Sequence, residues 1–189
     1  MSTGVRFMAI DPGFASIGWA IFDLSRDGVS VLAVGLVETK KATKKTKTLA
    51  AHDNWKRAHE IARQLSNLMV SYRVRAIAAE YMSFPRNASA AAKVALTWGV
   101  LAALTLWHAP MPMLQVSPQE TKLETTGSRS ASKTDVGAAM DAMFLGLSAL
   151  RANAAPVSKH EHINDAVAVG VAVLGSEEIG IMKSMLEER

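Results

Sequence analysis

Three consecutive apolar runs of strand length occupy the first forty residues, and no other feature constrains the fold as strongly. The first run, residues 5–10, ends at the turn signal Asp11-Pro12-Gly13. The second and third runs, residues 17–24 and 29–37, are β-branched and apolar, and a polar turn at residues 25–28 separates them. Apolar runs joined by polar turns are typical of strands that pair with their sequence neighbours. The pattern predicts three strands in an antiparallel meander.

The next eighty residues alternate between helical and strand patterns. Apolar residues recur at helical spacing over residues 53–72, and residues 87–108 are alanine-rich with a broad apolar face, so both segments are predicted to be helices. Short apolar runs at residues 75–80 and 113–116 predict a fourth and a fifth strand. Strands flanked by helices favour an α/β fold with a mixed five-stranded sheet.

More helices are predicted after the fifth strand. Ser117 and Glu120 have the spacing of a capping box around Pro118, which starts a short helix that ends near Gly127. The remaining segments are predicted to be a helix over residues 132–145, a polar loop over 151–160, a helix over 162–174 and further helical turns from 175.

Composition limits the chemistry that the chain can perform. A chain of 189 residues suits one compact domain, which we expect to cover residues 1–189. The absence of cysteine excludes disulfides, thiolate metal sites, iron–sulfur clusters and thiol nucleophiles, so any metal must be held by Asp, Glu, His or carbonyl oxygen. A net charge of +4 is compatible with a polyanionic partner but does not require one.

The apolar runs also bear on location. The run before Asp11 is too short for a signal-peptide core. The longest apolar stretch, residues 94–107, is shorter than the roughly 20 residues that span a bilayer. We therefore expect a soluble, cytoplasmic protein with no membrane contact.

Five lysines lie within residues 40–47, interleaved with threonine: Lys40, Lys41, Lys44, Lys45 and Lys47. This composition is typical of an exposed flexible loop with a local positive charge. Lys44 and Lys45 are therefore candidate DNA contacts, and the alternative is a solvated loop with no ligand.

Four side chains are candidates for a metal site. Asp11 follows the first predicted strand and Glu80 ends the fourth. His162 and Asp165 lie three residues apart, on one face of the helix predicted over 162–174. Converging carboxylates repel one another unless a cation lies between them, and oxygen ligands with one imidazole suit Mg²⁺ or Mn²⁺. Taken singly, the four have simpler roles: a turn former, a solvated strand end, a capping or surface histidine and a helix-start acid.

Four blocks of the sequence together resemble the RuvC-type Holliday-junction resolvases, which have a ribonuclease H-like fold. The blocks are MAIDPGFASIGWAIFD, RAIAAEYMSFPRNASAAAKVALTWGVL, LQVSPQETKLETTGSRSASKTDV and HINDAVAVGVAVL, in the family's order and over nearly the whole chain. The third block is the most specific, because Lys122 and Lys133 lie 11 residues apart around a Gly-Ser loop, as the family's two basic active-site residues do. The separation of Asp11 and Glu80, 69 residues, is longer than is typical of the family, and the lysine-rich segment lies within it.

The resemblance implies a role for each matching residue. The catalytic, metal-binding set would be Asp11, Glu80, His162 and Asp165, holding Mg²⁺, with Mn²⁺ able to substitute and two ions in each site. Lys122 and Lys133 would contact the DNA at the scissile phosphate and offset negative charge in the transition state.

The family also carries a base-stacking aromatic residue after the second acid. Tyr81 and Phe84 both compete for this role in the present chain. We favour Phe84, because Tyr81 adjoins a strand-end catalytic residue and is expected to pack in the core. With Arg86 beside it, Phe84 would combine stacking and a cation for unpaired nucleotides.

The implied activity is that of a structure-specific endonuclease that makes paired symmetric nicks in four-way DNA junctions and leaves ligatable 5′-phosphate ends. Symmetric cutting of two strands requires two active sites and therefore a two-fold homodimer. The apolar helix at residues 87–108 is the candidate interface, unless its Trp98 and Trp107 fill the core instead. A branch-migration helicase is a candidate partner. The location implied is the nucleoid, or the host cytoplasm for a phage-encoded member.

Three alternative functions remain open at the level of sequence. One is a nuclease of the same fold that acts on RNA or on other branched DNA. Another is a module that binds branched DNA without cutting it, although such a module would have no use for all four acidic and imidazole positions. The last is an actin-like phosphotransferase, which would need a second nucleotide-binding half for which 189 residues leave little room.

Overall fold

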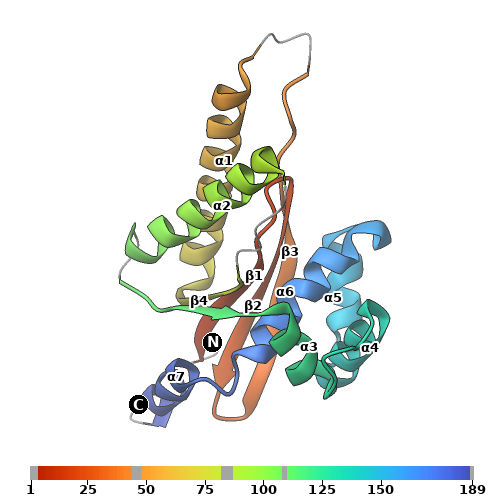
Figure 1. The fold of residues 1–189 in the computed structure, drawn as a ribbon. Helices are drawn as coiled ribbons and strands as arrows, with labels where there is room; N and C mark the ends of the chain where they lie inside the picture. Colours follow the sequence, from red (N-terminus) through yellow and green to blue (C-terminus); the bar gives the residue numbers. More distant parts are fainter. Residues whose placement is uncertain (1–3, 44–47, 82–86, 108–109, 188–189) are drawn as a thin grey trace.

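The computed structural model describes residues 4–43, 48–81, 87–107 and 110–187 (Figure 1). Four of the predicted DNA contacts lie outside these described residues: Lys44, Lys45, Phe84 and Arg86.

A five-stranded mixed sheet forms the centre of the molecule, in the order β3-β2-β1-β4-β5. The strands β1 (Val5–Asp11), β2 (Ser16–Ser25) and β3 (Gly28–Glu38) form the predicted antiparallel meander. The strands β4 (Val74–Glu80) and β5 (Met113–Val116) extend the sheet in parallel on the other side of β1. The sequence-based prediction of a mixed five-stranded α/β fold is confirmed.

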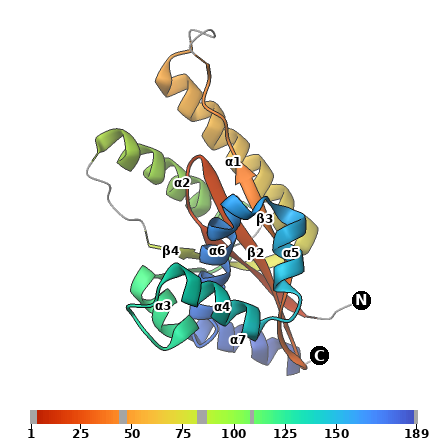
Figure 2. The ribbon, with the colours of Figure 1, turned by 90° about the vertical axis from the view of Figure 1, so that its right-hand side faces the viewer.

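Helices cover both faces of this sheet (Figures 1 and 2). On one face, α1 (Ala50–Tyr72) and α2 (Ala88–Trp107) pack on the side chains of Met8 and Ile10 of β1. The opposite face presents Phe7 and Ala9 to a second core cluster. That cluster includes side chains from α4 (Lys133–Met143), α5 (Leu147–Ala154), α6 (His160–Ala172) and α7 (Glu177–Glu187).

Two capping boxes begin the helices that follow β5. In α3 (Pro118–Thr126), Ser117 Oγ accepts from the backbone N–H of Glu120, whose carboxylate accepts from the N–H of Ser117. Ser132 and Asp135 make the same exchange at the start of α4. Each box satisfies backbone donors that a helix start leaves unpaired. Both predicted helix starts are confirmed, and the second fixes Lys133 as the first residue of α4.

The prediction of a polar loop over residues 151–160 is wrong. Residues up to Ala154 belong to α5, followed by a short 3-10 turn at Val157–Lys159 and then α6, which begins at His160 rather than near 162. Arg151 explains the error, because its charge is buried and is neutralised by Asp141 on α4 (2.6 Å) and bonded to Asn164 on α6 (2.7 Å). Asp165 consequently lies in the second turn of its helix, not in the first.

Helix α2 has the length and mean hydropathy, 1.5, of a membrane span, and it is the one such helix in the described part of the chain. The sequence-based conclusion that this apolar segment is too short to span a bilayer counted only residues 94–107, and it is wrong for the whole helix of 20 residues. Leu101 and Leu104 of α2 are buried in the core with α1. In addition, Thr97 Oγ1 donates to the Gly13 carbonyl (3.2 Å), so α2 is tied to the loop that follows β1.

Candidate active site

The carboxyl ends of β1 and β4 bring Asp11 and Glu80 to one edge of the sheet. The two strands are parallel neighbours, with Ile10 opposite Ala79, so the acids that follow these residues lie at the same level. Strand-end acids far apart in sequence meet for this topological reason.

Helix α6 crosses β1 and β2 and carries His162 and Asp165 to the same edge. Its close approach depends on Gly18 of β2, because a Cβ at this position would lie 1.8 Å from the carbonyl oxygen of His162. His162 Nδ1 is 3.0 Å from Asp11 Oδ2. This hydrogen bond, more than any other effect, raises the pKa of His162, against the opposing influence of burial.

The carboxylates at this edge act on one another electrostatically. Burial, followed by the charges of Asp11 and Asp165, raises the pKa of Glu80 to about 7. Burial and the charge of Asp11 likewise raise the pKa of Asp165. Burial and mutual repulsion therefore both oppose full ionisation of the carboxylates at this edge.

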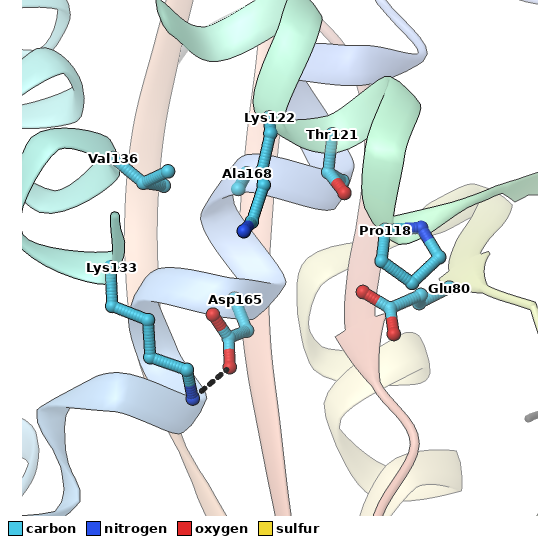
Figure 3. Close-up of a pocket in the computed structure, with 8 residues that line it drawn as sticks. All are labelled: Glu80, Pro118, Thr121, Lys122, Lys133, Val136, Asp165 and Ala168. Carbon is cyan, nitrogen blue, oxygen red and sulfur yellow. Dashed lines mark ion pairs between the residues drawn. The ribbon is translucent and has the colours of Figure 1, made fainter. Parts of the chain in front are cut away.

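Two lysines face the acids across a cavity of about 240 Å³ that is lined by residues from β4, α3, α4 and α6 (Figure 3). Lys133 Nζ lies 3.6 Å from Asp165 and 3.2 Å from the neighbouring Glu161, and the charge of Asp165 is the main cause of its raised pKa. Lys122 enters the cavity from α3, and its side chain lies between Lys133 and Glu80 in the view of Figure 3. The cavity thus joins both predicted basic residues to Glu80 and Asp165.

The donor set fits a hard divalent cation. Three carboxylates and one imidazole are the ligands that Mg²⁺ and Mn²⁺ accept, and a cation among them would offset the burial and the repulsion that raise the pKa of Glu80. Among the described residues, however, no three Asp, Glu or His side chains are grouped closely enough to hold an ion. Asp165 is engaged by Lys133 in this arrangement, so cation binding requires these side chains to exchange partners.

The sequence comparison then settles the family. The model described as Crossover junction endodeoxyribonuclease RuvC matches residues 7–173. The chain belongs to the RuvC family. The crossover junction endodeoxyribonuclease RuvC of Prochlorococcus marinus (strain MIT 9312) is 29% identical over 173 residues, which cover 92% of this chain and 98% of the relative.

Solved RuvC structures share the fold. Thermus thermophilus RuvC superimposes with a TM-score of 0.69 at 21% identity, over 93% of this chain and 97% of that one. T. thermophilus RuvC in complex with a Holliday junction substrate gives 0.66 at 18% identity, over 89% and 92%. The predicted ribonuclease H-like fold is confirmed, and membership of the family confirms the predicted enzyme class, crossover junction endodeoxyribonuclease.

Of the two aromatic candidates for base stacking in this RuvC-family chain, the structure describes only Tyr81. Tyr81 is 48% exposed, and its backbone N–H donates to the Val116 carbonyl (2.8 Å), so the expectation that its side chain packs in the core is wrong. Because Phe84 lies outside the described residues, the preference for Phe84 stays a prediction.

A buried clamp behind Asp11 was missed by the sequence analysis. The Phe14 carbonyl accepts from Thr39 Oγ1 (2.7 Å) and from the Arg57 guanidinium (3.3 Å), which also lies 4.3 Å above the Phe14 ring. Arg57 Nε donates to Thr39 Oγ1 (2.9 Å). The clamp holds the loop that follows β1, three residues beyond Asp11. No local signal marks it, because its members are far apart in sequence.

Glu80 gives the metal-free protein a measurable pH dependence. The folded-state pKa of about 7 lies above the ordinary value of 4.5, so the folded protein retains a proton that the unfolded chain releases. We therefore expect the free energy of unfolding to fall as the pH rises from about 5 to about 8, relative to Glu80→Gln, and to level off above that range. Urea denaturation of both proteins across this range, with and without Mg²⁺, measures the difference. Without metal, an equal dependence of the unfolding free energy on pH in the two proteins would contradict the assigned environment of Glu80. With Mg²⁺ added, the unfolding free energy of the wild-type protein should no longer fall relative to that of Glu80→Gln.

Proposed function

We propose that this chain resolves four-way DNA junctions by divalent-metal-dependent cleavage at the edge formed by Asp11, Glu80, His162 and Asp165. The observation that carries the proposal is the convergence of these residues from β1, β4 and α6, with Glu80 and Asp165 lining the same cavity as Lys122 and Lys133. The RuvC of T. thermophilus, which shares the fold, is described in complex with a Holliday junction substrate, and this supports the choice of substrate.

The four acidic and imidazole residues would hold Mg²⁺ or Mn²⁺, with two ions in each site. Bound divalent cations supply activation of the attacking water and stabilisation of the leaving oxygen in phosphodiester cleavage. Asp11 orients the imidazole of His162 through the 3.0 Å hydrogen bond. Lys133 and Lys122, across the cavity, would bind the scissile phosphate and offset the charge that grows in the transition state. The products would carry 5′-phosphate and 3′-hydroxyl ends.

The exposed side of α2 supports the proposal of a homodimer. From Ala92 to the end of the helix, every exposed residue is apolar: Ala92, Ala95, Leu96, Gly99, Ala102, Ala103, Leu106 and Trp107. Small residues allow two helices to approach closely, and an apolar stripe of this length is unfavourable in water. Trp107 is 74% exposed, so it does not fill the core. Two copies of α2 packed face to face would place two active sites on one junction.

Leu106→Glu tests the dimer. Leu106 is 73% exposed, so the substitution should leave the fold intact but weaken the dimer by at least about tenfold, because a charge enters an apolar contact. Sedimentation velocity measures the association. A plasmid with an extruded cruciform should then accumulate singly nicked circles instead of linear product. Leu145→Glu, at a fully exposed leucine away from α2, is the matched control. An unchanged dimer affinity in Leu106→Glu would contradict the assignment of α2 to the dimer interface.

The location proposed for this activity is the cytoplasm, at the nucleoid or, for a phage-encoded enzyme, with the phage DNA in the host. A branch-migration helicase that moves the junction before cleavage is the proposed macromolecular partner. Both proposals follow from the substrate, because a DNA junction forms and migrates where the genome is recombined.

A substrate panel tests the function as a whole. Purified protein is incubated with a mobile four-way junction, a linear duplex and a DNA–RNA hybrid, each with Mg²⁺ or with Mn²⁺. Paired symmetric nicks confined to the junction are the expected result. Preferential hydrolysis of the hybrid would overturn the substrate assignment, and junction binding without cleavage under either metal would overturn the proposed cleavage activity.

A further inference from the structure

Three aromatic rings are stacked on the outer face of α1, and we call them the ring ladder: His52, Trp55 and His59. The centroids of His52 and Trp55 lie 5.8 Å apart with a 20° angle between the ring planes, and those of Trp55 and His59 lie 5.7 Å apart at 25°. The spacing of three and four residues places all three rings on one side of the helix. The Trp55 side chain is 60% exposed.

The ring ladder has no role in the core. The buried residues of α1 are Asp53, Arg57, Ile61, Leu65 and Met69, which lie on the other side of the helix. Stacked aromatic rings normally gain much of their stability from burial, and this stack stands in solvent. The outer faces of the two terminal rings, His52 and His59, are therefore available to a ligand that offers a flat π face.

The charge around the ring ladder is positive. Lys56 is exposed on the same helix, and Lys40 and Lys41 are exposed on the segment that follows β3. The backbone N–H of Ala42 donates to Asp53 Oδ1 (2.9 Å), which fixes this segment against the first turn of α1 and directs the Asp53 carboxylate inwards. Further along the helix, Arg63 and Glu60 neutralise each other. The ligand should therefore be anionic as well as flat.

The ring ladder lies at the catalytic end of the sheet. Arg57, between Trp55 and His59 in sequence, contacts the Phe14 carbonyl in the loop that follows Asp11. The first turns of α1 extend beyond the end of the sheet to which β1 carries Asp11 (Figure 1). A polynucleotide engaged near the active site can continue along this projection.

We propose that the ring ladder binds unpaired nucleotides of a DNA strand, with bases extending the stack and phosphates contacting Lys40, Lys41 and Lys56. Unpaired nucleotides fit better than duplex DNA, since the bases of a duplex have both faces covered by their neighbours. Stacking on an aromatic side chain contributes about 1–3 kcal/mol per base and is tolerant of sequence. The inference rests on the proposed function only for the choice of DNA as the polynucleotide.

Binding of oligodeoxythymidylate by the intact protein at low salt, followed by fluorescence anisotropy of a label on the oligonucleotide, tests the ring ladder. Trp55→Ala should weaken binding about tenfold, because His52 and His59 lose the middle ring that holds them in one stack, and Trp55→Phe should restore most of the affinity because a flat ring is retained between them. An abasic oligonucleotide should bind both variants and the wild-type protein alike. Val70→Ala, at an exposed apolar residue farther along α1, is the control for an unrelated surface change.

Two results would overturn the ring ladder as a nucleotide site. One is oligonucleotide binding that is unchanged in Trp55→Ala, which would leave the ladder as a surface for a protein partner. The other is an equal loss with the abasic strand, which would show that the substitution acts on phosphate contacts or on the fold. Asp11→Asn separates this inference from the proposed function, because it should abolish cleavage and keep Trp55-dependent binding. Junction cleavage by a protein whose oligonucleotide binding does not depend on Trp55 would overturn the ring ladder as a nucleotide site and leave the proposed function intact.

Discussion

Replacing Asp11 with asparagine is expected to slow junction cleavage by about a thousandfold or more, a loss of at least ~4 kcal/mol of transition-state stabilisation. Asparagine keeps the size of the side chain but removes the charge that His162 bonds to and that, after burial, raises the pKa values of Glu80 and Asp165. The cation site therefore loses a carboxylate while the fold is retained. Single-turnover cleavage of a labelled junction measures the rate, and a gel-shift assay should show that junction binding persists.

The matched control for this substitution is Asp27→Asn, at an exposed acid in the turn between β2 and β3. It removes the same charge from the chain without touching the candidate site, so its cleavage rate should equal that of the wild-type protein. An Asp11→Asn protein that cuts within about tenfold of the wild-type rate would remove Asp11 from the catalytic set.

Lys133→Ala is the second substitution expected to have a large effect, a loss of about a hundredfold in cleavage rate. The capping box of α4 fixes Lys133 at the helix start, and its ammonium is the cation that the structure pairs with Asp165 (3.6 Å). Without this charge, a phosphate at the cavity loses a partner. The same charge lowers the pKa of Glu80, so the pH profile of the variant should shift to higher pH.

Lys183→Ala, at an exposed lysine of α7, is the control for the loss of one positive charge. The pH profile distinguishes an electrostatic role for Lys133 from a purely structural one, because a packing defect would lower the rate at every pH alike. A rate reduced by less than about threefold, with an unchanged profile, would exclude Lys133 from transition-state stabilisation.

The sheet was predictable from sequence because each of its strands has a recognisable local sequence pattern. The runs that form β1, β2 and β3 are apolar and bounded by turn residues, and parallel pairing of β1 with β4 then places Asp11 beside Glu80. The positions of His162 and Asp165 follow from one helix that crosses the same strands.

What escaped prediction depends on contacts between distant residues. The polar residues at the end of α5 were predicted to form a loop, because the sequence does not show that the charge of Arg151 pairs with Asp141 and bonds to Asn164 in the folded protein. The clamp formed by Thr39 and Arg57 on the Phe14 carbonyl is hidden for the same reason. Tertiary hydrogen bonds of this kind override local propensity.

The most direct test of the account is the binding of Mn²⁺ to the metal-free protein, followed by electron paramagnetic resonance, which detects the free ion. The wild-type chain should remove Mn²⁺ from solution saturably, and the double variant Asp11→Asn, Glu80→Gln should fail to do so at the same concentrations. Mg²⁺ should compete for the same site. Equal Mn²⁺ binding by the two proteins would contradict the claim that these carboxylates form the metal site on which cleavage depends.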